Sequence, residues 1–182
     1  MIIACLAWGS LVWDPQDLPI EDAWHTDGPQ LQVDYLRKSN DGRLTLVLTP
    51  AANMVPSLWA QMNCDTISQA IEALRKREKI PKSKEGNFIG QWSTGQPSPV
   101  CIENLSDWAK SKSIEHIVWT SLPPKFNDAT TVATPSQVIA YLASLTGEAR
   151  IKAEEYVRRT PVQIATTYRK IIEEQLHWTC KS

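Results

Sequence analysis

The chain has 182 residues, a formal net charge of -1 at pH 7 and a hydrophobic content of 42%. This length suits one domain with a sizeable core and is short for two domains. The balanced charge gives no electrostatic footprint for nucleic acid, and the hydrophobic content argues against extensive disorder. We therefore expect a single domain over residues 1–182 that does not bind nucleic acid.

The sequence also indicates a compartment. Its N-terminal segment has no basic region and an apolar run too short for a signal peptide, and no apolar stretch is long enough to cross a membrane. The cysteines lack C-x-x-C spacing, so we expect them to be reduced and to act as small hydrophobic side chains. They are Cys5, Cys64, Cys101 and Cys180. These features predict a cytoplasmic protein that has no membrane partner.

The first expected element is a short apolar run that ends at a glycine and a serine. Residues 2–7 predict a buried strand, and Gly9 and Ser10 interrupt the apolar pattern before it resumes at residues 11–13. Backbone N–H groups at such a corner need hydrogen-bond acceptors. Two interpretations stay open: an ordinary turn whose N–H groups face water or another strand, or a cradle for a carboxylate or a developing oxyanion.

Alternating patterns predict further strands. Residues 30–37 and 43–48 form the clearest hairpin, across the turn Ser39-Asn40-Asp41-Gly42. Residues 55–62 predict one strand with Pro56 at its start or at a sheet edge. Residues 82–86 indicate a charged loop. Three more strands are expected over residues 87–93, 98–103 and 114–120.

Capping patterns predict the helices, most of which lie toward the end of the chain. The capping box Thr66-Ile67-Ser68-Gln69 predicts a helix over residues 66–79, before Pro81, and residues 105–110 predict a short helical turn. Thr134-Pro135-Ser136-Gln137 and Thr160-Pro161-Val162-Gln163 each combine a threonine cap with proline at the first helical position. They predict helices over residues 135–145 and from residue 160 onward, with another over residues 148–158, in a helical tail of about residues 135–178. Strands followed by helices indicate an α+β domain.

Glu78 is an acidic residue on the expected core face of its helix. At about 100° per residue it lies within about 20° of Ile67 and about 40° of Leu74, whereas Glu72 lies about 140° from Ile67 and should be solvated. Periodicity leaves two outcomes open for Glu78. Its carboxylate is buried, or the helix end frays and the carboxylate reaches water or pairs with Arg75 or Lys82.

Two segments resemble a known family. Trp8-Gly9-Ser10-Leu11-Val12-Trp13-Asp14-Pro15 resembles the Tyr-Gly-Ser-Leu-Ile-Trp-x-Pro motif that opens gamma-glutamylcyclotransferase-like proteins, most closely the ChaC-like branch. Residues 71–79 are similar to the helix of that family that ends in Leu-Asp-x-Arg-Glu-Lys, and its glutamate falls on Glu78. The resemblance implies an α+β fold with a small mixed β-barrel or sheet and flanking helices.

The resemblance also implies a function. It assigns catalysis to Glu78 as the general acid and base, and substrate binding to Trp8, Gly9, Ser10 and Leu11. The implied enzyme is a lyase or transferase of glutathione metabolism that needs no metal or cofactor. It would convert the gamma-glutamyl group of a small molecule to 5-oxoproline and release the attached amine. Residues 119–127 fall where family members have a strand that leads to a substrate-side loop.

The sequence departs from the family at several positions. Trp8 replaces tyrosine, Arg75 replaces aspartate, and Ile80-Pro81-Lys82 replaces Gly-Gly-Tyr. A binding or regulatory module with the same fold and no catalysis is therefore an alternative. The residues do not distinguish a dipeptide, an amino acid or a polyamine as the released amine, and they specify no oligomeric state.

A second alternative is a hydrolase or transferase of another kind. It would use Cys5 or Cys101 as nucleophile with His116 as base. Both cysteines fall in expected strands, and a histidine in an apolar strand is more often structural.

Overall fold

The computed structural model describes residues 1–21, 23–127 and 132–180. The strands are β1 (Ile3–Ala7), β2 (Gln30–Lys38), β3 (Leu44–Leu48), β4 (Met54–Pro56), β5 (Leu58–Gln61), β6 (Ile89–Ser93) and β7 (His116–Thr120). The α-helices are α1 (Ile67–Arg77), α2 (Glu85–Phe88), α3 (Leu105–Ser111), α4 (Pro135–Ser144), α5 (Gly147–Arg159) and α6 (Thr167–Leu176). A short 3-10 helix, η1 (Lys82–Lys84), precedes α2.

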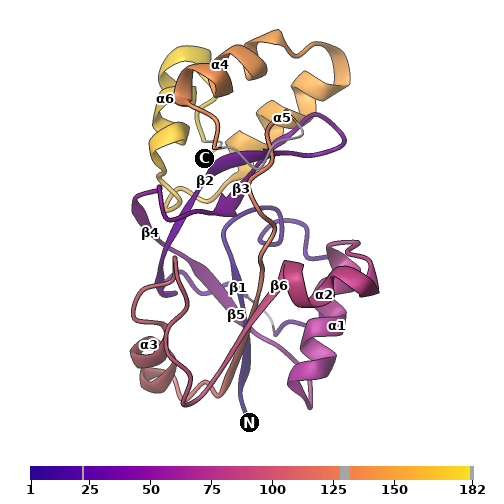
Figure 1. Ribbon diagram of the computed structural model, residues 1–182, viewed down its shortest axis with the longest axis vertical. Helices are drawn as coiled ribbons and strands as arrows, with labels where there is room; N and C mark the ends of the chain where they lie inside the picture. Colours follow the sequence, from indigo (N-terminus) through magenta and orange to yellow (C-terminus); the bar gives the residue numbers. More distant parts are fainter. Residues whose placement is uncertain (22, 128–131, 181–182) are drawn as a thin grey trace.

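The strands form two sheets (Figure 1). One has the order β5-β1-β7-β6, in which β1 and β7 are parallel and the other neighbours antiparallel. The other is antiparallel and has the order β3-β2-β4. In Figure 1, α4, α5 and α6 gather beside the β2–β3 hairpin, whereas α1 and α2 lie on one side of the first sheet and α3 on the other.

This architecture confirms the α+β class. A mixed sheet with flanking helices is present as expected. Over the described residues, however, neither sheet closes on itself, so the barrel form of the prediction is wrong. No helix among these residues has both the length and the apolar composition that crossing a bilayer requires.

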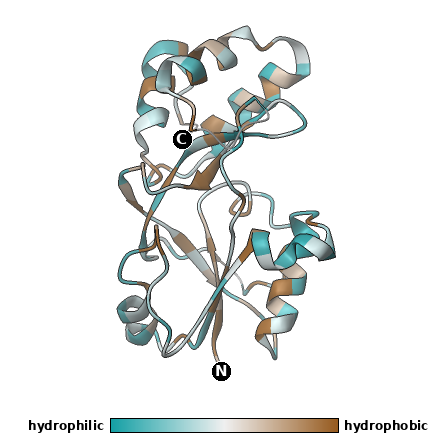
Figure 2. Ribbon diagram, in the orientation of Figure 1, coloured by the Kyte–Doolittle hydropathy of each residue, from teal (hydrophilic) through white to brown (hydrophobic). Residues whose placement is uncertain are grey.

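Strand β1 lies between two parts of the hydrophobic core. Ile3, Cys5 and Ala7 pack in the cluster that includes α1, whereas Ala4 and Leu6 pack in the larger cluster shared with the second sheet and the C-terminal helices. All five residues are at most 1% exposed. Figure 2 shows β1 brown along much of its length, while α1 carries both teal and brown residues. A strand buried on both faces is a rigid support for the loop that follows it.

Several sequence-based predictions are confirmed. The hairpin of β2 and β3 is present, and Gly42 in its turn has a φ of 86°, which favours glycine. Thr66 and Gln69 form the expected capping box of α1, and Thr134 with Gln137 forms that of α4. Strands β1, β6 and β7 lie within one or two residues of their predicted bounds.

The single strand predicted over residues 55–62 is wrong. The chain leaves the second sheet after β4 and enters the first as β5, and the change occurs at Ser57. Ser57 is fully buried, and both its N–H and its hydroxyl donate to the carbonyl of Pro29, at 3.1 and 2.7 Å. These bonds replace the ladder contacts that a continuous strand would make.

The strand predicted over residues 98–103 is also wrong. Cys101 and Asn104 have φ values of 72° and 55°, a left-handed backbone that interrupts a strand, and only an isolated bridge joins Ile102 to Leu31. Cys101 therefore lies in a loop. The charged loop predicted over residues 82–86 is η1 and the start of α2, where Lys82 lies 2.7 Å from the Glu85 carboxylate.

The helix predicted to begin at Thr160 begins at Thr167 instead. Thr160 ends α5: its hydroxyl donates to the carbonyl of Tyr156 and accepts the hydroxyl of Tyr35, each at 2.9 Å. The hydroxyl is therefore not free to cap a following helix. Thr166 caps α6, and its hydroxyl accepts the N–H of Arg169 at 3.1 Å.

Candidate functional site

The chain turns sharply after β1. The N–H of Val12 donates to the carbonyl of Gly9 at 3.0 Å, and the N–H of Asp14 donates to that of Ser10 at 2.9 Å. The N–H groups of Gly9, Ser10 and Leu11 donate no hydrogen bond to any described residue. Gly9 and Leu11 are buried, and buried N–H groups without an acceptor are rare in folded proteins. This turn therefore offers three neighbouring donors to a ligand.

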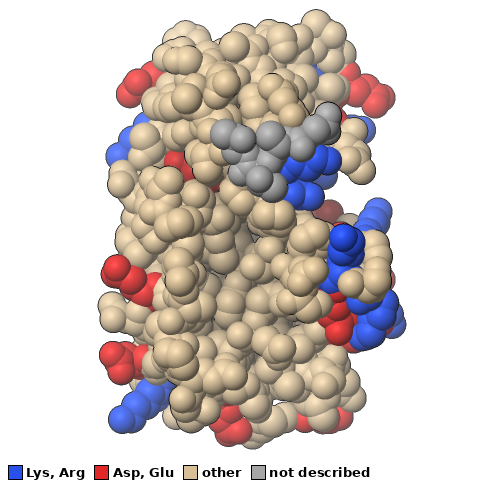
Figure 3. Space-filling model, viewed as in Figure 1, with Lys and Arg blue, Asp and Glu red and all other residues tan. Residues whose placement is uncertain are grey.

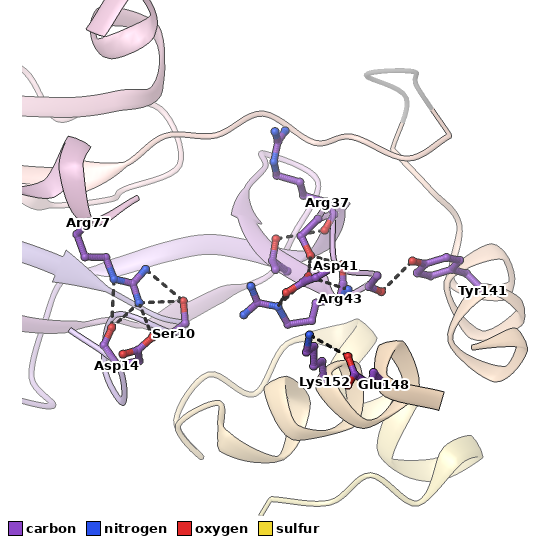
Figure 4. Close-up of polar contacts among 12 residues, drawn as sticks. Ser10, Asp14, Arg37, Asp41, Arg43, Arg77, Tyr141, Glu148 and Lys152 are labelled. Atoms are coloured by element: carbon purple, nitrogen blue, oxygen red, sulfur yellow. Dashed lines mark hydrogen bonds and ion pairs between the residues drawn. The ribbon is translucent and has the colours of Figure 1, made fainter. Parts of the chain in front are cut away.

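The end of α1 places an ion pair against this turn. Arg77 donates to the carboxylate of Glu78 at 2.7 Å. Its guanidinium also lies 3.4 Å from the hydroxyl of Ser10 and donates to the carbonyl of Asp14 (Figure 4). The side chains of Arg77 and Glu78 are 8% and 16% exposed. The carboxylate is thus largely buried and is held beside the turn, and the fraying alternative does not apply.

A cavity of about 300 Å³ has the turn and the end of α1 in its wall. Trp8, Gly9, Ser10 and Leu11 line it, and so does Glu78. All the residues expected at the site are therefore brought to one cavity, although they are far apart in the sequence. Further lining residues come from the β2–β3 hairpin, the end of β7 and α5, and include Arg37, Arg43, Thr120, Leu122 and Tyr156.

Tyr156 of α5 adds a polar group next to the turn. Its hydroxyl oxygen accepts the N–H of Leu46 at 3.3 Å, and the indole N–H of Trp8 donates to the carbonyl of the same Leu46 at 3.4 Å. A Cβ added to Gly9 would lie 2.5 Å from the Tyr156 oxygen, so the two residues are in close contact. Burial raises the pKa of Tyr156 to about 12, which keeps the hydroxyl protonated at neutral pH. No described residue accepts its hydrogen, which can therefore be donated to a ligand.

Thr120, at the end of β7, has an unused polar atom in the same wall. Its hydroxyl is buried and has no hydrogen-bond partner among the described residues. Because an unsatisfied buried hydroxyl is costly, it is a further candidate to contact a ligand. Thr120 and Leu122 belong to the segment that the resemblance associates with a substrate-side loop.

The sequence-based prediction did not single out Arg37, Arg77 and Tyr156, which also line the cavity. Sequence alternation would put Arg37 on the same face as Val33 and Tyr35. The β2–β3 register shifts between Tyr35 and Arg37, however, so the two residues pair with neighbouring residues of β3 and face opposite sides. No local signal marked Tyr156, which lies on the apolar face of its helix near buried Ala153 and Val157.

The arrangement does not favour a cysteine nucleophile. Cys5 is fully buried, its thiol lies 3.6 Å from the carbonyl of Leu6, and burial raises its pKa. The Nδ1 atom of His116 lies 2.8 Å from the hydroxyl of Ser93 rather than near a cysteine. Over the described residues, no group of three or more histidine, cysteine or acidic side chains is placed to hold a metal ion.

No protein-family model matches the chain. No curated protein matches it either. The cavity itself and the resemblance of the two short segments are therefore the grounds on which a function can be inferred.

Proposed function

We propose that this chain is a gamma-glutamylcyclotransferase-type enzyme of the ChaC-like kind. The observation that carries the proposal is that one cavity is lined by Glu78 and by Gly9, Ser10 and Leu11, whose N–H groups donate no hydrogen bond to any described residue. Such a site combines a proton carrier with donors for a carboxylate or an oxyanion. The resemblance of the sequence around both features supports the same reaction.

The reaction is intramolecular. The α-amine of a gamma-glutamyl group, after losing a proton, attacks the carbon of its own side-chain amide. A C–N bond closes the five-membered ring of 5-oxoproline, and the original amide C–N bond breaks. The ring nitrogen gives up a second proton as it becomes the lactam N–H, and the departing amine takes up both protons and leaves as an ammonium ion. Holding the substrate in a folded conformation supplies much of the rate, because well-oriented intramolecular reactions reach effective molarities of about 10⁵–10⁸ M.

The residues of the cavity have distinct roles in this reaction. Glu78 takes the proton from the α-ammonium and returns it to the leaving amine. The turn at Gly9, Ser10 and Leu11 binds the α-carboxylate or the carbonyl oxygen, and Tyr156 donates a further hydrogen bond beside it. Arg77 is a positioning residue that orients the carboxylate of Glu78.

A location in the cell is part of the same proposal. Among the described residues, Cys5, Cys64 and Cys101 carry thiols, which suits a reducing compartment. We therefore infer that the enzyme acts in the cytoplasm.

The test is an assay for 5-oxoproline with purified protein, glutathione and a panel of gamma-glutamyl amides. We expect product from the wild-type chain and a loss of about 10²-fold or more in kcat for Glu78→Gln. The control is Glu72→Gln, because Glu72 is on the same helix but pairs with Arg75 and Lys82 and is absent from the cavity wall. A ligand-dependent thermal shift without product would instead favour the non-catalytic binding module. A fully active Glu78→Gln would contradict the assignment of the base.

A further inference from the structure

Four cationic side chains of the described residues line the cavity, and they differ in how their charge is balanced. Arg77 pairs with Glu78 at 2.7 Å, and Arg43 pairs with Asp41 at 2.9 Å. Lys79 is exposed, so water solvates its ammonium group. Arg37 remains, and it is half-buried.

Arg37 has no carboxylate partner among the described residues. One of its N–H groups donates to the carbonyl of Pro123 at 2.8 Å, and this is its one side-chain hydrogen bond within those residues. A guanidinium has five N–H donors, so most of them remain available. Burial lowers the pKa of Arg37, which is the sign of a cation that loses solvation without gaining an anion. An anionic ligand group would remove this cost and could be bound by two parallel hydrogen bonds.

The position of Arg37 separates it from the turn after β1. It lies at the end of β2, just beyond an irregularity in the β2–β3 register, and the bond to Pro123 anchors its side chain. Figure 4 shows Arg37 well away from Ser10 and Arg77, and its guanidinium points away from the pair of Asp41 and Arg43. In Figure 3, lysine and arginine side chains lie on both sides of a notch at the edge of the molecule. The cavity therefore offers an anion site at a distance from the donors of the turn.

We propose that Arg37 is a specificity-determining residue, which binds a carboxylate on the amine that the reaction releases. This inference rests on the proposed function. The turn and Glu78 hold the gamma-glutamyl part, and the second carboxylate of the substrate is then the group that reaches Arg37. A polyamine as leaving group would instead bring positive charge to an unbalanced guanidinium, and repulsion would disfavour it.

The test compares two substrates that differ in one group. Gamma-glutamylglycine and gamma-glutamylglycinamide share the reacting atoms, but only the first carries a carboxylate on the leaving amine. Charge-assisted hydrogen bonds of this kind correspond to roughly a tenfold to hundredfold preference in kcat/KM. We expect wild-type protein to prefer gamma-glutamylglycine by that factor, and Arg37→Gln to bring the ratio close to one, mainly by lowering kcat/KM for gamma-glutamylglycine.

Arg150→Gln is the matched control. Arg150 is also half-buried, lies over the Trp178 ring at 5.4 Å and is absent from the cavity wall, so its loss should leave the ratio unchanged. If the ratio of the two kcat/KM values in Arg37→Gln equals that of wild type, the inference is overturned. An equal fall in kcat/KM for both substrates also overturns it, because Arg37 would then act on the gamma-glutamyl part. In both cases wild-type turnover would preserve the proposed function. No product from either substrate would contradict the proposed function, and this inference with it.

Discussion

The guanidinium of Arg77 lies 2.7 Å from the carboxylate of Glu78, its neighbour in the sequence. The same guanidinium reaches Ser10 and Asp14, which precede it by 67 and 63 residues. One side chain thus connects the proposed proton carrier to the proposed substrate cradle. Loss of the Arg77 side chain should disturb the position of Glu78 relative to the turn more than it disturbs the core, because α1 keeps its buried residues Ala70 and Leu74.

We therefore expect Arg77→Gln to lower kcat by roughly tenfold to hundredfold, since small misplacements of reacting groups have effects of this size. KM should change less than kcat, because the donors of the turn remain. The control is Lys76→Gln, which removes the adjacent cation, 71% exposed and paired with Glu72, and should leave both constants unchanged. Steady-state kinetics of the two variants provide the measurement. A fall in kcat for Lys76→Gln, or none for Arg77→Gln, would contradict this role.

Tyr156→Phe tests the hydroxyl next to the turn. We expect kcat to fall by roughly 10²-fold, which is the usual effect of losing one donor to developing charge. The ring should keep its edge-to-face contacts with Trp13 and Tyr35, at 5.3 and 6.2 Å, so a large loss of stability is not expected.

Tyr35→Phe is the matched control for Tyr156→Phe. Its hydroxyl is equally buried but donates to Thr160, and Tyr35 is absent from the cavity wall. This control should lose about 0.5–1.5 kcal/mol of stability with its hydrogen bond and keep its kcat. Equal kinetic effects in the two variants would show that the hydroxyl of Tyr156 acts only through the fold.

Gly9→Ala tests the close contact between the turn and α5. The new methyl group would lie 2.5 Å from the Tyr156 oxygen and 3.4 Å from the ring carbon that carries it, and the packed ring cannot move away easily. We expect the free energy of unfolding to fall by about 1–3 kcal/mol. Urea denaturation measures this change. Adding Tyr156→Phe to Gly9→Ala should restore part of the loss, whereas purely additive effects would mean that the contact is not the cause.

The local elements were largely predictable because their signals are local. The capping box of Thr66 and Gln69 fixed the start of α1, and the period of the helix placed Glu78 on the side of Leu74. To predict that Glu78 lies at a cavity, the turn after β1 was also needed. A glycine and a serine within an apolar run already indicated that turn. These two segments could be found from the sequence because each carries its own pattern.

The features that were predicted wrongly or missed from the sequence have long-range causes. Ser57 ends β4 because Pro29 accepts its N–H and hydroxyl, and Thr160 fails to start a helix because Tyr35 occupies its hydroxyl from 125 residues away. Tyr156 likewise reaches the cavity only because α5 packs against β3, and its hydroxyl meets Leu46 across 110 residues. No window of sequence contains such pairs, so tertiary contacts decided these features.

The buried carboxyl of Asp34 makes stability depend on pH in an unusual direction. Asp34 is 2% exposed, and burial raises its pKa, although it accepts hydrogen bonds from Thr166 at 2.6 Å and from the N–H of Tyr35 at 2.9 Å. Between the unfolded pKa, about 3.9, and the higher folded value, the folded state keeps a proton that the unfolded state has lost. Stability from this group is therefore complete below about pH 3.9 and falls as the pH rises through the folded pKa.

Asp34→Asn removes this titration and keeps a side chain of the same shape with one carbonyl acceptor. Urea denaturation of both proteins from about pH 3 to 7 gives the difference in unfolding free energy, wild type minus variant, at each pH. Carboxyls whose pKa is lowered, such as those of Asp27 and Asp41, make stability depend on pH in the opposite direction. Because they are present in both wild type and Asp34→Asn, their effects cancel in the difference in unfolding free energy. We expect the difference to fall as the pH rises above about 3.9. A difference that stays flat or increases would show that the hydrogen bonds to Asp34 outweigh its burial.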